Sequence, residues 1–170
     1  MKIGKNGLNN LKIKLKKLKQ PLMTYIWDTN IILHKIRNAD FFDALNRKYD
    51  FNRQQNKVCI SSVTVGEIHA IALRNRWGKK KMHDLEQLIQ NLTVIPVTDD
   101  PDLIKMYAEI DVYSQSHHPI LKLPTPARKM GKNDLWIAAT TAIYNATLIS
   151  TDDDFTHLDG LFLAFEKIIV

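Results

Sequence analysis

Short apolar segments alternate with helical patterns along most of this chain, and that alternation restricts its fold more than any other feature. Strands are expected at 24–27, 57–61, 93–97 and 147–150, and the tail 161–170 is again strand-like. The segments between them carry the spacing and end signals of helices. Strands that are separated in this way predict an α/β fold, with a parallel sheet that has helices on both faces.

The expected helices and loops complete this pattern. Helices are expected from about 31, at 40–45, 64–74 and 80–91, from the cap at 99–101 to about 116, and at 133–145. The polar run 46–56 is expected to be an exposed connection, and 117–132, with three prolines and a glycine, must be a loop. We expect residues 23–170 to form one domain and residues 1–22 to precede it as an extension.

The positive charge of the chain is concentrated at its start. The formal net charge is +6, but seven of the 24 basic residues and none of the 18 acidic ones lie in residues 1–20. The remainder therefore has 17 basic against 18 acidic side chains, so affinity for nucleic acids cannot be assigned to the whole chain from its net charge.

Residues 1–22 carry the pattern of a basic amphipathic helix, with leucines at 3-4-3-4 spacing, lysines between them and Pro21 near the end. Three interpretations stay open: an arm that contacts nucleic-acid phosphates or an anionic membrane surface, a partner-binding helix, or an extension upstream of a true start at Met23. The single cysteine and the lack of a secretory signal or an apolar span of about 20 residues fit a cytoplasmic protein.

Four acidic residues stand where a predicted strand ends or a predicted helix begins: Asp28, Glu67, Asp134 and Asp152. They are spread over most of the chain, so only folding can bring them together. In parallel α/β sheets, sites form just beyond the carboxyl ends of the strands. Carboxylates that meet there repel one another, which raises the pKa of some of them or favours a bound divalent cation.

Each of these acids also has a purely structural interpretation. Asp28 stands at the start of a helix, where aspartate is a common N-cap. Thr64 and Glu67 have the spacing of a capping box, in which the glutamate folds back onto the start of its own helix. Asp134 in a first helical turn is favoured by the helix dipole. Only their joint position at one edge of the predicted sheet favours the functional interpretation.

The run of three aspartates at 152–154 is the least easily explained by structure alone. Solvation makes their repulsion tolerable at a surface but does not explain why three aspartates are adjacent. A nearby cation would explain it. We expect Asp152 to point into the site and Asp153 to face solvent. Asp154 is expected to be a secondary ligand or a helix cap.

Four segments resemble the PIN domain, especially the compact VapC-type ribonuclease toxins of bacterial toxin–antitoxin pairs. The segments are 26–33 (IWDTNIIL), 61–68 (SSVTVGEI), 133–140 (NDLWIAAT) and 148–155 (LISTDDDF), and the third is the most distinctive. Their order and spacing match over about Met23 to Val170. The loop at 117–128 looks longer than its counterpart in compact toxins, and the lysine-rich start lies outside the domain.

The resemblance implies a single-domain, Rossmann-like sheet and a Mg²⁺- or Mn²⁺-dependent endoribonuclease. It gives the four acids the role of the acidic cluster, with Asn30, Ser150 and Thr151 as polar positions beside it. It also implies an RNA substrate, a homodimer and a small antitoxin that holds the protein inactive. RNA-processing nucleases and catalytically inactive members belong to the same family and remain alternatives.

A chemical hypothesis for the cluster follows from its donors. Oxygen ligands without histidine or cysteine suit Mg²⁺ or Mn²⁺. Our hypothesis is that Asp28, Asp134 and Asp152 hold the ion or ions and that Glu67 orients or deprotonates the attacking water. Because the 2′-hydroxyl is not needed, the products would carry 5′-phosphate and 3′-hydroxyl ends.

Two basic groups are candidates for substrate contact. Arg128, Lys129 and Lys132 lie just before Asp134 and would contact phosphates that flank the cut. A second group surrounds Trp77 and comprises Arg74, Arg76, Lys79, Lys80 and Lys81. Here we favour a packed tryptophan and solvated lysines over stacking of a base on Trp77. The adjacent His117 and His118 are expected to be exposed rather than a metal pair.

One rival function comes from another enzyme class. A phosphatase of the haloacid-dehalogenase type also begins with an aspartate after the first strand of an α/β sheet. That mechanism needs a second aspartate two residues later, where this chain has Asn30. A trapped aspartyl-phosphate would therefore support the phosphatase and contradict the nuclease.

Overall fold

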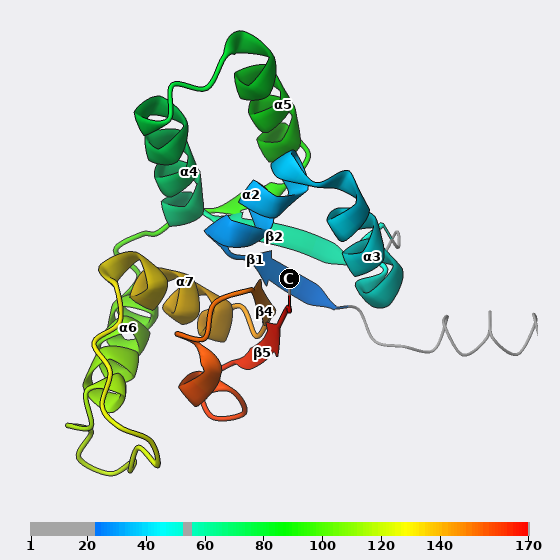
Figure 1. Cartoon of the computed structure of the whole chain (residues 1–170). Coiled ribbons are helices and arrows are strands. Elements are labelled where there is room, and N and C mark those ends of the chain that lie inside the picture. Colours follow the sequence, from blue (N-terminus) through cyan, green and yellow to red (C-terminus); the bar gives the residue numbers. More distant parts are fainter. Residues whose placement is uncertain (1–22, 53–55, 170) are drawn as a thin grey trace, which may run out of the picture.

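The computed structural model describes residues 23–52 and 56–169 and contains a five-stranded parallel sheet between two layers of helices (Figure 1). The strand order is β3-β2-β1-β4-β5, and every neighbouring pair is parallel. The strands are β1 (Thr24–Trp27), β2 (Lys57–Ser61), β3 (Thr93–Ile95), β4 (Thr147–Ser150) and β5 (Ala164–Lys167). The predicted α/β fold with a parallel sheet is confirmed.

The order of the strands reverses at the centre of the sheet. The chain builds β1, β2 and β3 outward in one direction and then returns to place β4 on the other side of β1. Ile26 in β1 pairs with Cys59 of β2 and with Leu148 of β4. Such a reversal of strand order is the point where doubly wound sheets bind ligands. The carboxyl ends of β1 and β4 therefore mark the candidate site.

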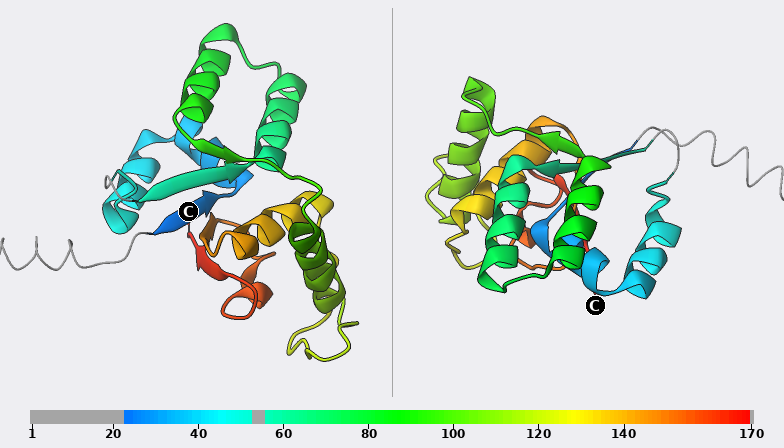
Figure 2. Two further views of the ribbon diagram at one scale, coloured as in Figure 1. Left: turned by 180° about the vertical axis from the view of Figure 1, so that it is seen from behind. Right: turned by 90° about the horizontal axis from the view of Figure 1, so that it is seen from above.

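The alternation of side chains along β1 explains the two helical layers. Tyr25 and Trp27 point to one face of the sheet, and Ile26 points to the other. The first face is covered by α2 (Thr29–Arg37), α3 (Ala39–Tyr49), α4 (Ser62–Arg74) and α5 (Lys79–Gln90), and the second by α6 (Pro101–Ser114) and α7 (Lys132–Ile143). The views of Figure 2 show both layers, with α4 and α5 projecting away from the sheet. A 3-10 turn at Thr156–Leu158 precedes β5.

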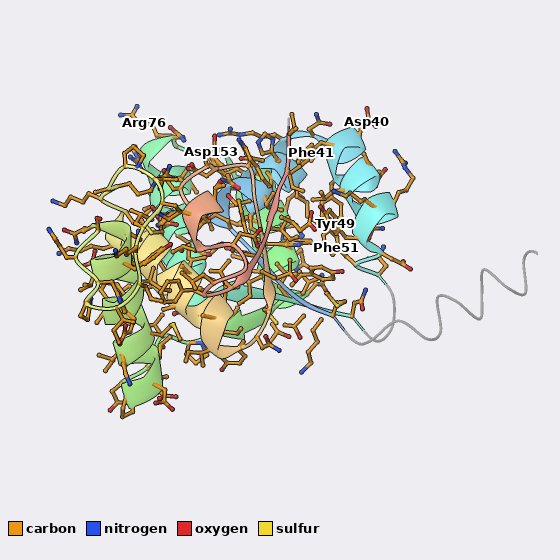
Figure 3. The ribbon with its side chains drawn as sticks, turned by 90° about the horizontal axis from the view of Figure 1, so that it is seen from below. Asp40, Phe41, Tyr49, Phe51, Arg76 and Asp153 are labelled. Carbon is orange, nitrogen blue, oxygen red and sulfur yellow. The ribbon has the colours of Figure 1, made fainter. Side chains whose placement is uncertain are left out.

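The helix expected at 40–45 is longer than predicted, because α3 runs from Ala39 to Tyr49. The prediction of an exposed connection at 46–56 is therefore wrong for its first residues. The amide of Phe41 donates to the Asn38 side chain at the N-terminus of α3, and the helix continues to Tyr49. Phe51 is buried and stacks on Tyr49, with ring centroids 5.5 Å apart (Figure 3). The rings also pack against Tyr25 of β1. The sequence did not predict this aromatic cluster, because polar residues surround Phe51 in the chain.

The extension 1–22 lies outside the described residues, so the interpretations given for it stay predictions. Within 23–52 and 56–169, the helices are too short or too polar to cross a membrane.

Candidate active site

Asp28 is held at the carboxyl end of β1 by the sheet itself. Its amide donates to the carbonyl of Ile149 in β4 at 3.1 Å. Its carboxylate accepts hydrogen bonds from the Thr29 amide at 2.6 Å and from the Ser150 hydroxyl at 2.7 Å. Burial raises the pKa of Asp28 to about 6, although these two hydrogen bonds act to lower it. The charges of Glu67 and Asp152 add to the rise. Asp28 therefore caps α2 and also faces other carboxylates.

Glu67 does not form the capping box that its spacing suggested. Helix α4 begins at Ser62, three residues earlier than the box requires, because the Ser61 hydroxyl accepts the Val63 amide at 3.2 Å. Glu67 therefore lies beyond the first turn and is free to bond outside its own helix. The structural interpretation of Glu67 as a cap is wrong.

Two polar residues that the sequence did not single out hold Glu67 in place. The Thr29 hydroxyl donates to one carboxylate oxygen at 2.5 Å, and the Asn133 amide donates to the other at 2.7 Å. Thr29 follows Asp28 directly, and Asn133 precedes Asp134 directly. Each is adjacent to a candidate acid, and that adjacency was the only signal in the sequence.

Asp134 lies in the first turn of α7, as expected, and close to the other acids. Burial raises its pKa to about 7, followed by repulsion from Asp28, Glu67, Asp154 and Asp152. Its carboxylate folds over the backbone of Gly131, where an added Cβ would come within 2.5 Å of Oδ2. The glycine at 131 therefore allows the carboxylate to occupy this position.

A polar network joins the end of β4 to the start of α2. The Asn30 side-chain amide donates to the Ser150 hydroxyl at 3.0 Å, and its carbonyl accepts the Thr151 amide at 3.3 Å. The Asp152 amide donates to the same hydroxyl at 3.0 Å. Asn30, Ser150 and Thr151 thus lie beside Asp28. The Asn30 amide is not an acid, which leaves the phosphatase mechanism without its second aspartate.

The rest of the aspartate run is tied to nearby cations. Asp153 is exposed, as expected, and its bond with Lys167 lowers the pKa of its carboxyl. The Arg128 guanidinium donates to the Asp153 carbonyl at 2.8 Å and lies 3.6 Å from the Asp154 carboxylate. Arg128 therefore fixes this segment. Lys129 and Lys132 are exposed.

The four predicted acids converge at one edge of the sheet. Asp28 and Asp134 each experience the charges of Glu67 and Asp152. Within the described part of the chain, no three His, Cys, Asp or Glu side chains are already arranged as a metal cage. Mg²⁺ is usually held by one or two carboxylates and completed by waters and phosphate oxygens. The crowded, oxygen-only donors of Asp28 and Asp134 fit such an ion.

Two other candidates have structural roles. His118 was expected to be exposed, but its side chain is only 7% exposed. Its ring bonds to Glu109 at 2.6 Å and accepts the amides of Ile120 and Leu121, so it organises the long loop. Trp77 packs against the core of the first helical layer, with Lys81 Nζ 3.8 Å from its ring centre. This supports a packed Trp77.

The chain matches the family profile described as the PIN domain over residues 25–161. Ribonuclease VapC2 from Haemophilus influenzae is 24% identical over 131 residues, which are 77% of this chain and 88% of that protein. Ribonuclease VapC5 from Mycobacterium tuberculosis is 29% identical over 107 residues, 62% of this chain and 71% of that protein.

Solved structures agree with this match at the level of the fold. VapBC2 from Rickettsia felis bound to a DNA fragment from its promoter superimposes with a TM-score of 0.66 at 21% identity, covering 85% of this chain and 98% of that one. VapBC-1 from nontypeable Haemophilus influenzae gives 0.63 at 20% identity, with the same coverage. With its strand order and the four segments that carry the acids, the chain belongs to the PIN domain family.

Proposed function

We propose that this protein is a metal-dependent endoribonuclease that hydrolyses RNA phosphodiester bonds with an activated water. The observation that carries the proposal is the convergence of Asp28, Glu67, Asp134 and Asp152, with the pKa of Asp28 raised to about 6 and that of Asp134 to about 7. Crowded carboxylates of this kind are typical of sites that bind a cation. The relatives named Ribonuclease VapC support the activity.

We assign the metal-holding role to Asp28, Asp134 and Asp152. When bound there, a Mg²⁺ or Mn²⁺ ion lowers the pKa of a water and neutralises charge on the attacked phosphate. Ser150 orients the Asp28 carboxylate, and Asn30 in turn orients Ser150. Gly131 leaves space for the Asp134 carboxylate. These residues pre-position the two most crowded acids, which reduces the reorganisation that binding requires.

We assign Glu67 the orientation or deprotonation of the nucleophilic water. Thr29 and Asn133 each occupy one of its carboxylate oxygens, so the carboxylate cannot rotate freely. The remaining lone pairs accept a proton in a fixed direction. Lys129 and Lys132 are exposed before Asp134 and are proposed to contact flanking phosphates, whereas Arg128 acts by holding the aspartate run.

We also propose that the protein is the toxin of a toxin–antitoxin pair and that it forms a homodimer. The likeness to VapBC structures supports an antitoxin partner. A short reading frame that overlaps or adjoins this one and whose product co-purifies with the chain would support the pair. Growth arrest by the wild-type chain, relieved by that product, tests it.

The activity is tested with the purified full chain and defined RNAs, in Mg²⁺ and in a chelator. We expect Mg²⁺-dependent cleavage that gives 5′-phosphate and 3′-hydroxyl ends and that Asp28→Ala abolishes. A 2′,3′-cyclic phosphate product would contradict a water nucleophile. Cleavage or growth arrest that is unchanged in Asp134→Asn would instead support a non-catalytic PIN module.

A further inference from the structure

A hollow of about 460 Å³ extends from the acid cluster along one face of α4. It is lined by Val63, Gly66, Glu67, Ala70, Ile71, Arg74 and Asn133. The α4 residues recur at helical spacing, so they share one face, and Glu67 and Arg74 are about 10 Å apart along the helix axis. We call this hollow the α4 groove. Glu67 and Asn133 lie near one end of the groove, and Arg74 lies at the other.

The groove contains a glycine that the fold itself does not require. Gly66 lies inside α4, and a Cβ added there would meet no heavy atom within 4 Å. A glycine in a helix interior is less stable than alanine at the same place, because it loses more backbone entropy. Packing within the chain gives no reason for the missing side chain. Close approach of a bound molecule would give one.

The far end of the groove leads to a turn that is rich in basic side chains. We call Arg74, Arg76, Lys79, Lys80 and Lys81 the basic turn; they join α4 to α5 at the end of these helices remote from the sheet (Figure 1). All but Lys81 are exposed, and Figure 3 shows Arg76 at the periphery of the molecule. Among the residues described, none of the five lies within ion-pair distance of an acid.

The lysines of the basic turn also make the start of their own helix, α5, less stable. Lys79, Lys80 and Lys81 form the first turn of α5, which has no acid there and no side-chain cap from Gly78. The positive end of the helix dipole and these cations repel one another. A polyanion bound at the turn would relieve both this repulsion and that among the cations.

We propose that the α4 groove and the basic turn bind a single-stranded RNA segment on one side of the cleaved bond. This inference rests on the proposed nuclease function and specifies where its substrate lies. The segment leaves the acid cluster past Gly66 and Ala70, where the small side chains admit its backbone. Val63 and Ile71 give the groove an apolar surface for sugars or bases, and the basic turn receives the phosphates.

The charge of the turn favours RNA as the occupant over a protein segment. The body of the chain outside residues 1–20 is nearly neutral, so a cluster of five cations is a local exception. A single strand supplies closely spaced phosphates over the whole length from groove to turn. Each contact with a lysine or arginine releases counterions, which gives a salt signature that can be measured.

The test compares two double substitutions in RNA binding, each combined with Asp134→Asn to prevent cleavage. Lys79→Gln with Lys80→Gln removes two charges of the basic turn. Lys105→Gln with Lys122→Gln removes two exposed lysines on α6 and its following loop. For single strands, each lost phosphate contact lowers the slope of log affinity against log salt by about 0.7, or about fivefold in affinity at 0.1 M salt. The turn variant should bind about 25-fold more weakly than the control.

Gly66→Ala tests the groove independently of charge. The added methyl group enters the groove, so RNA affinity should fall, while the melting temperature should rise or stay unchanged because the helix gains stability. A fall in both would show a folding defect, and would overturn the argument from Gly66. The turn variant should likewise melt no lower than its parent, since it removes repulsion from the start of α5.

The outcomes separate this inference from the nuclease proposal. If the wild-type chain cleaves RNA and the turn variant keeps the affinity and salt slope of the control, the path along α4 is wrong and the nuclease stands. If the turn variant loses only the binding of a protein partner, the basic turn serves that partner and the RNA path is again wrong. If the wild-type chain neither binds nor cleaves any RNA, both proposals fail.

Discussion

The acid cluster and the basic turn both crowd like charges, but the surrounding solvent makes their consequences different. At the acid cluster, Asp28 is 5% exposed, and burial raises its pKa to about 6. At the basic turn, Lys79 and Lys80 are exposed, so water and salt screen their repulsion. Burial therefore decides where crowded charges shift a pKa into a range that is useful for chemistry. The exposed Asp153 shows the opposite behaviour, because its bond with Lys167 lowers the pKa of its carboxyl.

The largest expected effect is loss of cleavage when a crowded acid is neutralised. Asp134→Asn removes a proposed ligand and should lower the rate by more than about 100-fold, above the usual loss for a residue that only orients a ligand. Asp153→Asn is the matched control, because Asp153 faces Lys167 and not the cluster. Rates on one defined RNA at saturating Mg²⁺ provide the measurement. Equal losses in the two variants would remove the distinction between buried and exposed acids.

The next effect is a dependence of stability on pH. The carboxyls of Asp28 and Asp134 have a pKa of 3.8 when unfolded and of about 6 and about 7 when folded. Between these values the folded chain binds more protons than the unfolded chain, so stability falls as pH rises from about 4 to about 7. The penalty is absent below the unfolded pKa and complete above the folded one. After allowance for screening, we expect about 2 kcal/mol for the pair.

Urea unfolding between these pH values, without divalent cations, measures that dependence. Asp28→Asn should flatten the curve relative to wild type, because asparagine caps α2 about as well as aspartate and carries no charge. Acids outside the cluster, such as Asp153 with its lowered pKa, titrate equally in both proteins and cancel in the difference. Loss of the Asp28 charge also lowers the pKa of Asp134, which flattens the curve further. Parallel curves would contradict the raised pKa of Asp28.

A smaller effect on the cleavage rate is expected at Gly131, whose backbone lies against the Asp134 carboxylate. Gly131→Ala places a Cβ 2.5 Å from Asp134 Oδ2, so the carboxylate must move. We expect a loss of about 10-fold in cleavage rate, as for loss of an orienting contact, with little change in melting temperature. Thermal unfolding and cleavage rates measured on one preparation test this. An unchanged rate would show that the position of Asp134 is not critical.

The smallest effect concerns the stability of the basic turn. Lys79→Glu replaces an unfavourable charge at the start of α5 by a favourable one and should stabilise the chain by about 0.5 kcal/mol at low salt. For a chain of this length that corresponds to about 1–2 °C in melting temperature. The gain should disappear in high salt. A loss of stability would show that the turn is not under electrostatic repulsion.

The fold and the positions of the acids could be predicted from the sequence, because both depend on local signals. The composition of the sequence predicts the strand at Thr24–Trp27 and the proline-rich loop. Asp28 and Asp134 lie at the ends of the elements that these signals define. What they bond to depends on residues far away in the chain. Glu67 is held by Thr29 and Asn133, at separations of 38 and 66 residues, so its capping motif was misleading.

Burial and aromatic packing were also beyond the reach of local patterns. Phe51 is surrounded by polar residues in the sequence, yet it packs on Tyr49 and against β1. His118 looked like an exposed loop residue, but Glu109 and two backbone amides enclose its ring. In each case one partner lies on another element, Tyr25 of β1 for Phe51 and Glu109 of α6 for His118.

The most direct test of the central claim is thermal unfolding at pH 8 with and without Mg²⁺, for wild type and for Asp28→Asn. If the converging carboxylates bind the ion, Mg²⁺ raises the melting temperature of the wild type by mass action and has a much smaller effect on the variant. Equal shifts in the two proteins, or no shift in the wild type at millimolar Mg²⁺, would contradict the account.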